Sequence, residues 1–138
     1  TEVEEVLDQA KEEGLINSSE YNAMRQQFES LLQQEQVASW FDSSWEVRTE
    51  APILSPDKPD VRVDRILFKE DRVVVIDYKS GEPRKKDEEQ VMTYMSILAE
   101  MDYVKIEGYL LYLATGSVVS IKTLAIKKKE NNQLGLGL

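Results

Sequence analysis

The chain has 138 residues, of which 41% are hydrophobic and 31% charged, and it contains neither cysteine nor histidine. This size and composition predict one domain with a single continuous core. The missing residue types exclude disulfide frameworks, thiolate zinc sites, cysteine nucleophiles and Ser-His triads within the chain, so hydrolytic chemistry here would rely on carboxylates, lysine and a metal ion.

The net charge of -9 is unevenly distributed. Residues 1–60 contain 4 Lys or Arg against 14 Asp or Glu, a net of -10, whereas residues 61–138 contain 13 against 12, a net of +1. A free-standing DNA-binding protein usually presents a basic face, so this distribution favours a module to which a neighbouring domain delivers nucleic acid. The absence of cysteine and of a signal-peptide pattern is compatible with a cytoplasmic location, and no apolar run approaches the roughly 20 residues of a membrane span.

Apolar residues at helical spacing predict helices in the first third of the chain. The first is expected over residues 2–13 and should end at Gly14. A second begins after Asn17, and residues 33–41 either continue it or form a short further helix. The apolar stripes that support these helices are Val3, Val6, Leu7 and Ala10 in the first, and Tyr21, Met24, Phe28, Leu31 and Leu32 in the second.

From Trp45 the hydrophobic period changes to that of β-strands. A proline-containing loop follows the first strand, residues 69–71 are short enough for a hairpin turn, and the tail from Lys127 is expected to be frayed. One more helix is predicted over residues 86–101. The predicted strands cover residues 45–51, 61–68, 72–78, 105–113 and 118–126.

Two acidic residues fall on strand faces that otherwise carry apolar side chains. Alternation places Asp64 on the apolar face of its strand, and Asp77 and Lys79 on that of the next strand. If the two strands pair as a hairpin, the carboxylates lie close together and repel each other unless a cation lies between them, and oxygen ligands suit Mg²⁺ or Mn²⁺. Lys79 beside such an ion could orient an attacking water or stabilise charge on a phosphate.

Structural interpretations compete with this one. A single Asp-X-Lys at a strand end is more often structural than catalytic, and a buried carboxylate there can pair with Arg65 or Arg48. On the following helix Gln90 and Tyr94 are four residues apart and share a face. Tyr94 can equally be a core residue, whereas an amide such as Gln90 at the head of an apolar stripe indicates a polar edge.

Taken together, three segments resemble the motifs of RecB-type nucleases in the PD-(D/E)XK superfamily. They are residues 63–66 (VDRI), 75–81 (VIDYKSG) and 90–94 (QVMTY). Residues 108–112 are also similar to that group, and the resemblance covers roughly residues 40–121. It implies an α/β, restriction-endonuclease-like fold, with a central mixed β-sheet flanked by helices in the order α-α-β-β-β-α-β-β. The single nuclease domain would comprise N-terminal helices (1–44), a catalytic sheet and helix (45–126) and a tail (127–138).

The resemblance also implies roles for individual residues. The implied ligands of Mg²⁺ or Mn²⁺ are Asp64, Asp77 and the carbonyl of Tyr78. The implied catalytic residues are Asp64, Asp77, Lys79 and, from the first strand, Glu50, while the implied DNA contacts are Gln90 and Tyr94. Such nucleases usually carry a metal-binding histidine on the first helix. This chain has none, and we expect that residue to lie upstream of Thr1.

The implied function is metal-dependent hydrolysis of DNA phosphodiesters by an exonuclease module. This module would lie at the C-terminal end of a UvrD-like bacterial helicase-nuclease that acts in double-strand break repair and recombination. Its partners would be DNA, the helicase domain upstream in the same parent chain and a second helicase-nuclease subunit, in the bacterial cytoplasm. The isolated module is expected to fold but to cut DNA poorly. Two alternatives are a catalytically inactive nuclease fold that binds DNA or serves as a scaffold, and an unrelated acidic interaction domain.

Overall fold

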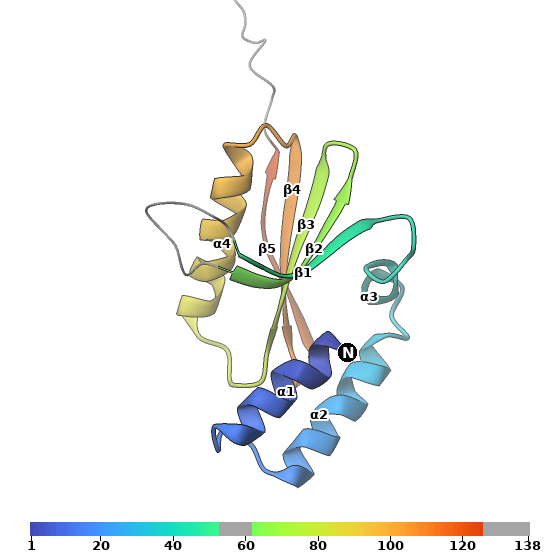
Figure 1. Ribbon diagram of the computed structural model, residues 1–138, viewed down its shortest axis with the longest axis vertical. Coiled ribbons are helices and arrows are strands. Elements are labelled where there is room, and N and C mark those ends of the chain that lie inside the picture. The colour runs from blue at the N-terminus through green and yellow to red at the C-terminus, as the bar shows by residue number, and fades with distance from the viewer. Residues whose placement is uncertain (53–61, 126–138) are drawn as a thin grey trace, which may run out of the picture.

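The computed structural model describes residues 1–52 and 62–125, which form a five-stranded sheet flanked by helices (Figure 1). The strands, which lie side by side in chain order, are β1 (Glu46–Pro52), β2 (Arg62–Lys69), β3 (Arg72–Lys79), β4 (Lys105–Tyr112) and β5 (Ser117–Ala125). The helices are α1 (Glu2–Glu12), α2 (Ser18–Leu31), α3 (Glu35–Ser39) and α4 (Lys85–Ala99).

The sheet is mixed because one of its four strand pairs is parallel. β3 and β4 run in the same direction, and the other neighbours are antiparallel. A parallel pair needs a crossover connection, which α4 supplies, whereas β2 and β3 are joined by the predicted tight turn at Glu70 and Asp71. The α/β class with a central mixed sheet is therefore confirmed.

Local capping interactions explain where the N-terminal helices begin. The Asn17 side chain accepts a hydrogen bond from the Glu20 N–H at 2.8 Å, and the Glu20 carboxylate accepts one from the Asn17 N–H at 2.9 Å, which forms a capping box at the start of α2. Gly14, with a φ of +75°, follows α1 as predicted. Gln34 adopts an extended conformation, so α3 is a separate short helix and not a continuation of α2.

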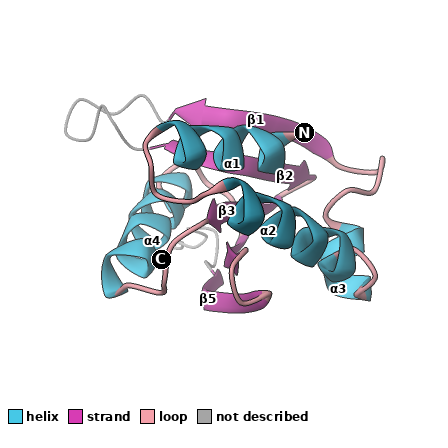
Figure 2. Ribbon diagram, turned by 90° about the horizontal axis from the view of Figure 1, so that it is seen from below, coloured by secondary structure: helices cyan, strands magenta, loops and turns pink. Residues whose placement is uncertain are grey.

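Each face of the sheet is covered by a different set of helices (Figure 2). One apolar cluster joins α1, α2 and α3 to the sheet through Leu67, Val74, Ile76, Tyr78 and Leu111. The other joins α4 to the sheet through Ile66, Val73, Val75, Leu110 and Tyr112. Alternate residues of β3 therefore face opposite clusters, as strand geometry requires, and this strand is buried on both sides.

Gly108 lets α4 approach the sheet closely. A Cβ atom at this position of β4 would lie 2.5 Å from the Met95 sulfur and 2.8 Å from Cγ1 of Val91, distances that are too short for van der Waals contact. The absence of a side chain at Gly108 therefore sets how near α4 lies to β4. It also affects how far the polar residues at the start of α4 lie from the sheet.

No helix within residues 1–52 and 62–125 is both long and apolar enough to cross a lipid bilayer. The expected proline-containing loop after β1 and the expected frayed tail fall at residues 53–61 and 126–138, outside the described residues.

Gly108→Ala should destabilise the protein by about 1–3 kcal/mol, because the added methyl group forces α4 away from β4. The measurement is the free energy of unfolding from urea denaturation. Gly81→Ala is the matched control, since a Cβ there meets no atom within 4 Å, and it should change stability by less than about 0.5 kcal/mol. Equal effects of the two substitutions would contradict the close packing of α4.

Candidate active site

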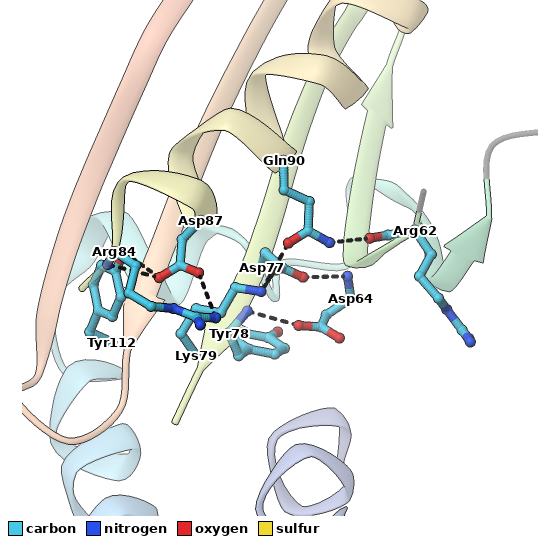
Figure 3. Close-up of polar contacts among 9 residues, drawn as sticks. All are labelled: Arg62, Asp64, Asp77, Tyr78, Lys79, Arg84, Asp87, Gln90 and Tyr112. Carbon is cyan, nitrogen blue, oxygen red and sulfur yellow. Dashed lines mark hydrogen bonds and ion pairs between the residues drawn. The ribbon is translucent and has the colours of Figure 1, made fainter. Parts of the chain in front are cut away.

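Asp64 and Asp77 replace main-chain pairing where β2 and β3 separate. The residue pairs of this hairpin run from Lys69 with Arg72 to Arg65 with Ile76. One step further, the Asp64 N–H donates to Oδ1 of Asp77 at 3.1 Å and the Tyr78 N–H donates to Oδ2 of Asp64 at 2.8 Å (Figure 3). Each carboxylate thus holds a backbone N–H of the opposite strand, which fixes both at the end remote from the turn.

Lys79 joins this pair to α4. Its ammonium nitrogen lies 2.9 Å from Oδ2 of Asp77 and 3.0 Å from Oε1 of Gln90 (Figure 3). The Gln90 amide nitrogen donates in turn to the Arg62 carbonyl at 3.2 Å. Gln90 therefore bridges the start of β2 and the end of β3, and the structure brings together Asp64, Asp77, Lys79 and Gln90.

The local electrostatics leave the two carboxylates undercompensated. Asp77 is only 4% exposed and Asp64 is half-buried. Burial, and then the neighbouring charge of Asp77 and a hydrogen bond with it, raise the pKa of Asp64 to about 8, against the smaller opposing effects of the Tyr78 N–H and Lys79. One ammonium does not balance a buried and a half-buried carboxylate, so the site favours a proton or a cation at this position.

A cavity of about 430 Å³ opens over these residues. The sheet side is formed by Asp64, Asp77, Tyr78, Lys79 and Gln90, and α1 with the residues after it forms the opposite wall through Val6, Gln9, Ala10, Glu13 and Leu15. A second cavity of about 550 Å³ shares Lys79 and Ser80 with the first and extends past Pro83 to Arg84. The four polar groups therefore face a space that can accept a ligand.

The other predicted site residues occupy different environments. Glu50 has a positive φ of 48° and borders the same cavity, where it pairs with Arg62 at 3.4 Å. Tyr94 is buried in the cluster between α4 and the sheet, and this burial raises its pKa to about 12. Its packing role is therefore visible in the structure, and its contact with DNA stays a prediction.

The two arginines considered as partners for the carboxylates lie elsewhere. Arg65 pairs with Glu2 of α1 and donates to the Trp40 carbonyl, and Arg48 lies over the ring of Phe68. The Tyr78 hydroxyl also donates to Glu2 at 2.9 Å. Sequence reasoning missed this connection, because no local pattern links residues 76 positions apart.

Asp87 was also missed, although a sequence signal exists for it. It is 3% exposed and occupies the third position of α4, where an acidic side chain commonly caps the helix. Its hydrogen bonds reach Arg84 and, across 25 residues, the hydroxyl of Tyr112.

A comparison with protein families matches residues 2–134 to the PD-(D/E)XK nuclease superfamily. The chain belongs to this superfamily. A search among curated proteins found no match. The mixed five-stranded sheet agrees with the restriction-endonuclease-like fold, and membership excludes the interpretation as an unrelated acidic interaction domain.

Nucleases of the superfamily typically use divalent metal ions, and the donors present are compatible with one. Within the part of the chain that the structure describes, no group of three or more Asp, Glu, His or Cys residues is arranged to hold a metal. Mg²⁺, however, usually keeps several water ligands and needs only one or two carboxylates. The facing pair Asp64 and Asp77, with its raised proton affinity, fits a hard cation of that kind.

The raised pKa of Asp64 predicts a pH-dependent stability in the absence of divalent ions. Its pKa rises from an ordinary 3.8 to about 8 in the folded state. Between these pH values the folded protein retains a proton that the unfolded chain has lost, so the free energy of unfolding falls as pH rises. Asp64→Asn keeps the acceptor for the Tyr78 N–H but carries no titrating proton. It should therefore melt roughly 5 °C above the wild type at about pH 8 and close to it at about pH 4.5.

Calorimetric melting in the presence of a chelator measures this difference. Asp71→Asn, in the exposed turn between β2 and β3, is the matched control and should shift the melting temperature little at either pH. A stabilisation by Asp64→Asn that is equal at both pH values would contradict the assigned pKa.

Proposed function

We propose that this chain is a Mg²⁺- or Mn²⁺-dependent DNA nuclease with its active site at Asp64, Asp77 and Lys79. The observation that carries the proposal is the convergence of two carboxylates, an ammonium and an amide on one wall of a cavity. A structural ion pair would need one carboxylate beside Lys79. A second carboxylate that is largely removed from water at the same place costs free energy, and a cation that binds between the two offsets this cost.

The cation would be held by Asp64, Asp77 and the carbonyl of Tyr78. The N–H and C=O groups of one strand residue point toward the same neighbouring strand, and the Tyr78 N–H donates to Asp64. Its carbonyl is therefore directed toward the carboxylate pair. When bound, the ion would stabilise negative charge on a phosphoryl oxygen and lower the pKa of a bound water.

Lys79 is prepared to act on a phosphate. An ammonium has three N–H donors, and two of them are directed to Asp77 and Gln90. The third can donate to a non-bridging phosphate oxygen or orient the attacking water. Because the other two contacts hold the ammonium in place, little reorganisation is needed when negative charge develops on the phosphate.

The finer assignment is to a RecB-type exonuclease. Its support is the order of the three motifs and the position of Gln90 at the cavity, where its amide would contact DNA together with Tyr94. We assign residues 1–138 to one nuclease domain, joined in the parent chain to an upstream helicase domain that supplies the strand. The net charge of -9 fits a site to which DNA is delivered, since the chain offers little attraction for a polyanion. Its role would be in bacterial double-strand break repair.

Asp77→Asn and Lys79→Met should each lower Mg²⁺- or Mn²⁺-dependent cleavage by at least about a hundredfold, because each removes a charged group that acts on the reacting phosphate. The measurement is turnover of end-labelled single-stranded DNA by the chain joined to its helicase domain, with and without divalent ions. Asp71→Asn and Lys105→Met change exposed residues of the same types and should cleave like the wild type. DNA binding without ion-dependent cleavage in the wild type would support the inactive scaffold instead.

Gln90→Ala should reduce turnover about tenfold while it changes the melting temperature by no more than a few degrees. The substitution leaves Lys79 with one fewer acceptor and removes an amide from the cavity wall, but it deletes little buried apolar surface. Cleavage kinetics and thermal melting of the same preparation separate the two effects. A lowered melting temperature with unchanged kinetics would show that Gln90 is purely structural.

A further inference from the structure

A buried polar cluster lies beside the candidate active site, at the start of α4. Oδ2 of Asp87 accepts a hydrogen bond from the Arg84 N–H at 3.1 Å and one from the Tyr112 hydroxyl at 3.2 Å (Figure 3). The Arg84 guanidinium approaches Oδ1 of Asp87 at 3.5 Å. Tyr112 is 1% exposed, so Asp87 links the first turn of the helix to the interior of the sheet.

Capping alone does not account for this burial. Glu20 occupies the same third position of α2 and likewise accepts a hydrogen bond from the backbone N–H of its N-cap residue, yet it remains exposed to solvent. Asp87 is 3% exposed and accepts a hydrogen bond from the Tyr112 hydroxyl. A buried carboxylate is costly unless it is well bonded. The carboxylate at the start of α4 is therefore buried, whereas the one at the start of α2 is not, and its burial allows a hydrogen bond between α4 and β4.

That contact lies next to the residues of the site. Tyr112 is the register partner of Lys79 in the parallel pair of β3 and β4, and the Leu113 N–H donates to the Lys79 carbonyl at 2.9 Å. Gln90 follows Asp87 by three residues and shares its side of the helix. Asp87 and Tyr112 therefore connect the helix that carries Gln90 to the strand end that carries Lys79.

We propose that Asp87 and Tyr112 are positioning residues that hold Gln90 at bonding distance from Lys79. This inference rests on the proposed nuclease function, in which neither residue needs to touch the substrate. Without their hydrogen bond the first turn of α4 can shift outward. A displacement of about 1 Å at a reacting site can cost about a hundredfold in rate, and an outward shift of this turn would lengthen the 3.0 Å bond between Lys79 and Gln90. The Tyr112 hydroxyl remains a donor, because burial and the nearby Asp87 raise its pKa to about 12.

The first arm of the test does not depend on activity. NMR resonances of the Gln90 side-chain amide and the Lys79 ammonium are compared in the wild type, Asp87→Asn, Tyr112→Phe and the control Glu20→Gln. We expect both resonances to move in the first two variants and to stay in place in the control. Tyr112→Phe removes only a hydroxyl group, so it remains informative if Asp87→Asn folds poorly. Unchanged Gln90 and Lys79 resonances in Tyr112→Phe would overturn the proposal.

The second arm is a double-mutant cycle on cleavage by the chain joined to its helicase domain. Asp87→Asn should lower kcat about tenfold with little change in KM, and this loss should vanish when Gln90 is already alanine, because the two residues act through one contact. An undiminished loss in the Gln90→Ala background would show that Asp87 acts on stability alone. If the wild type cleaved no DNA, the proposed function would fail, while the resonances would still decide whether Asp87 positions Gln90.

Discussion

The hydrogen bonds that Asp64 and Asp77 exchange with the backbone of the opposite strand hold the end of the β2–β3 hairpin in a shape that ordinary strand pairing would not produce. Each carboxylate accepts an N–H that would otherwise pair with a carbonyl. The strands can therefore separate while their backbone groups stay bonded, which buried main-chain groups require. The separation creates room for a ligand, and the same bonds keep two like charges together. The raised pKa of Asp64 follows from this arrangement.

Helices α1 and α4 both contact the end of β3. α4 returns the chain from β3 to β4 and lies close to the sheet because Gly108 has no side chain, so Gln90 reaches Lys79 from above. On the other face, Glu2 of α1 contacts both Tyr78 and Arg65, which places α1 as the far wall of the cavity. Two helices distant in sequence, α1 and α4, thus enclose one site. A carboxylate of each helix accepts a hydrogen bond from a tyrosine of the sheet, Glu2 from Tyr78 and Asp87 from Tyr112.

The charge distribution of the chain is consistent with such a site in a larger assembly. All of the excess acidity belongs to residues 1–60, and Glu13 and Glu50 line the cavity. Negative charge near a phosphate site slows the approach of DNA. It also raises the local concentration of divalent cations. In the proposed protein, this chain would therefore set the affinity for the metal, and the helicase domain would set the affinity for the DNA strand.

Sequence alone determined the local features, because periodicity and capping act over a few residues. It predicted the helices, the hairpin, and the shared face of Asp77 and Lys79, since alternation along a strand is a fixed property of its backbone. It also assigned Asp64, Lys79 and Gln90 to one site through the resemblance to a nuclease family. It left open whether residues 33–41 form a separate helix and whether Tyr94 lines the site or packs in the core. The structure places Gln90 at the cavity and Tyr94 in the core.

Tertiary structure decided every contact that joins distant elements. The bond between Asp87 and Tyr112 spans 25 residues, and the one between Glu2 and Tyr78 spans 76. Such pairs depend on the register of β3 against β4 and on where α1 docks, and neither is encoded by the residues nearby. The partners of Arg65 and the raised pKa of Asp64 have the same origin. Burial and the distance between charges are properties of the packed chain, so they exist only once the strands and helices have come together.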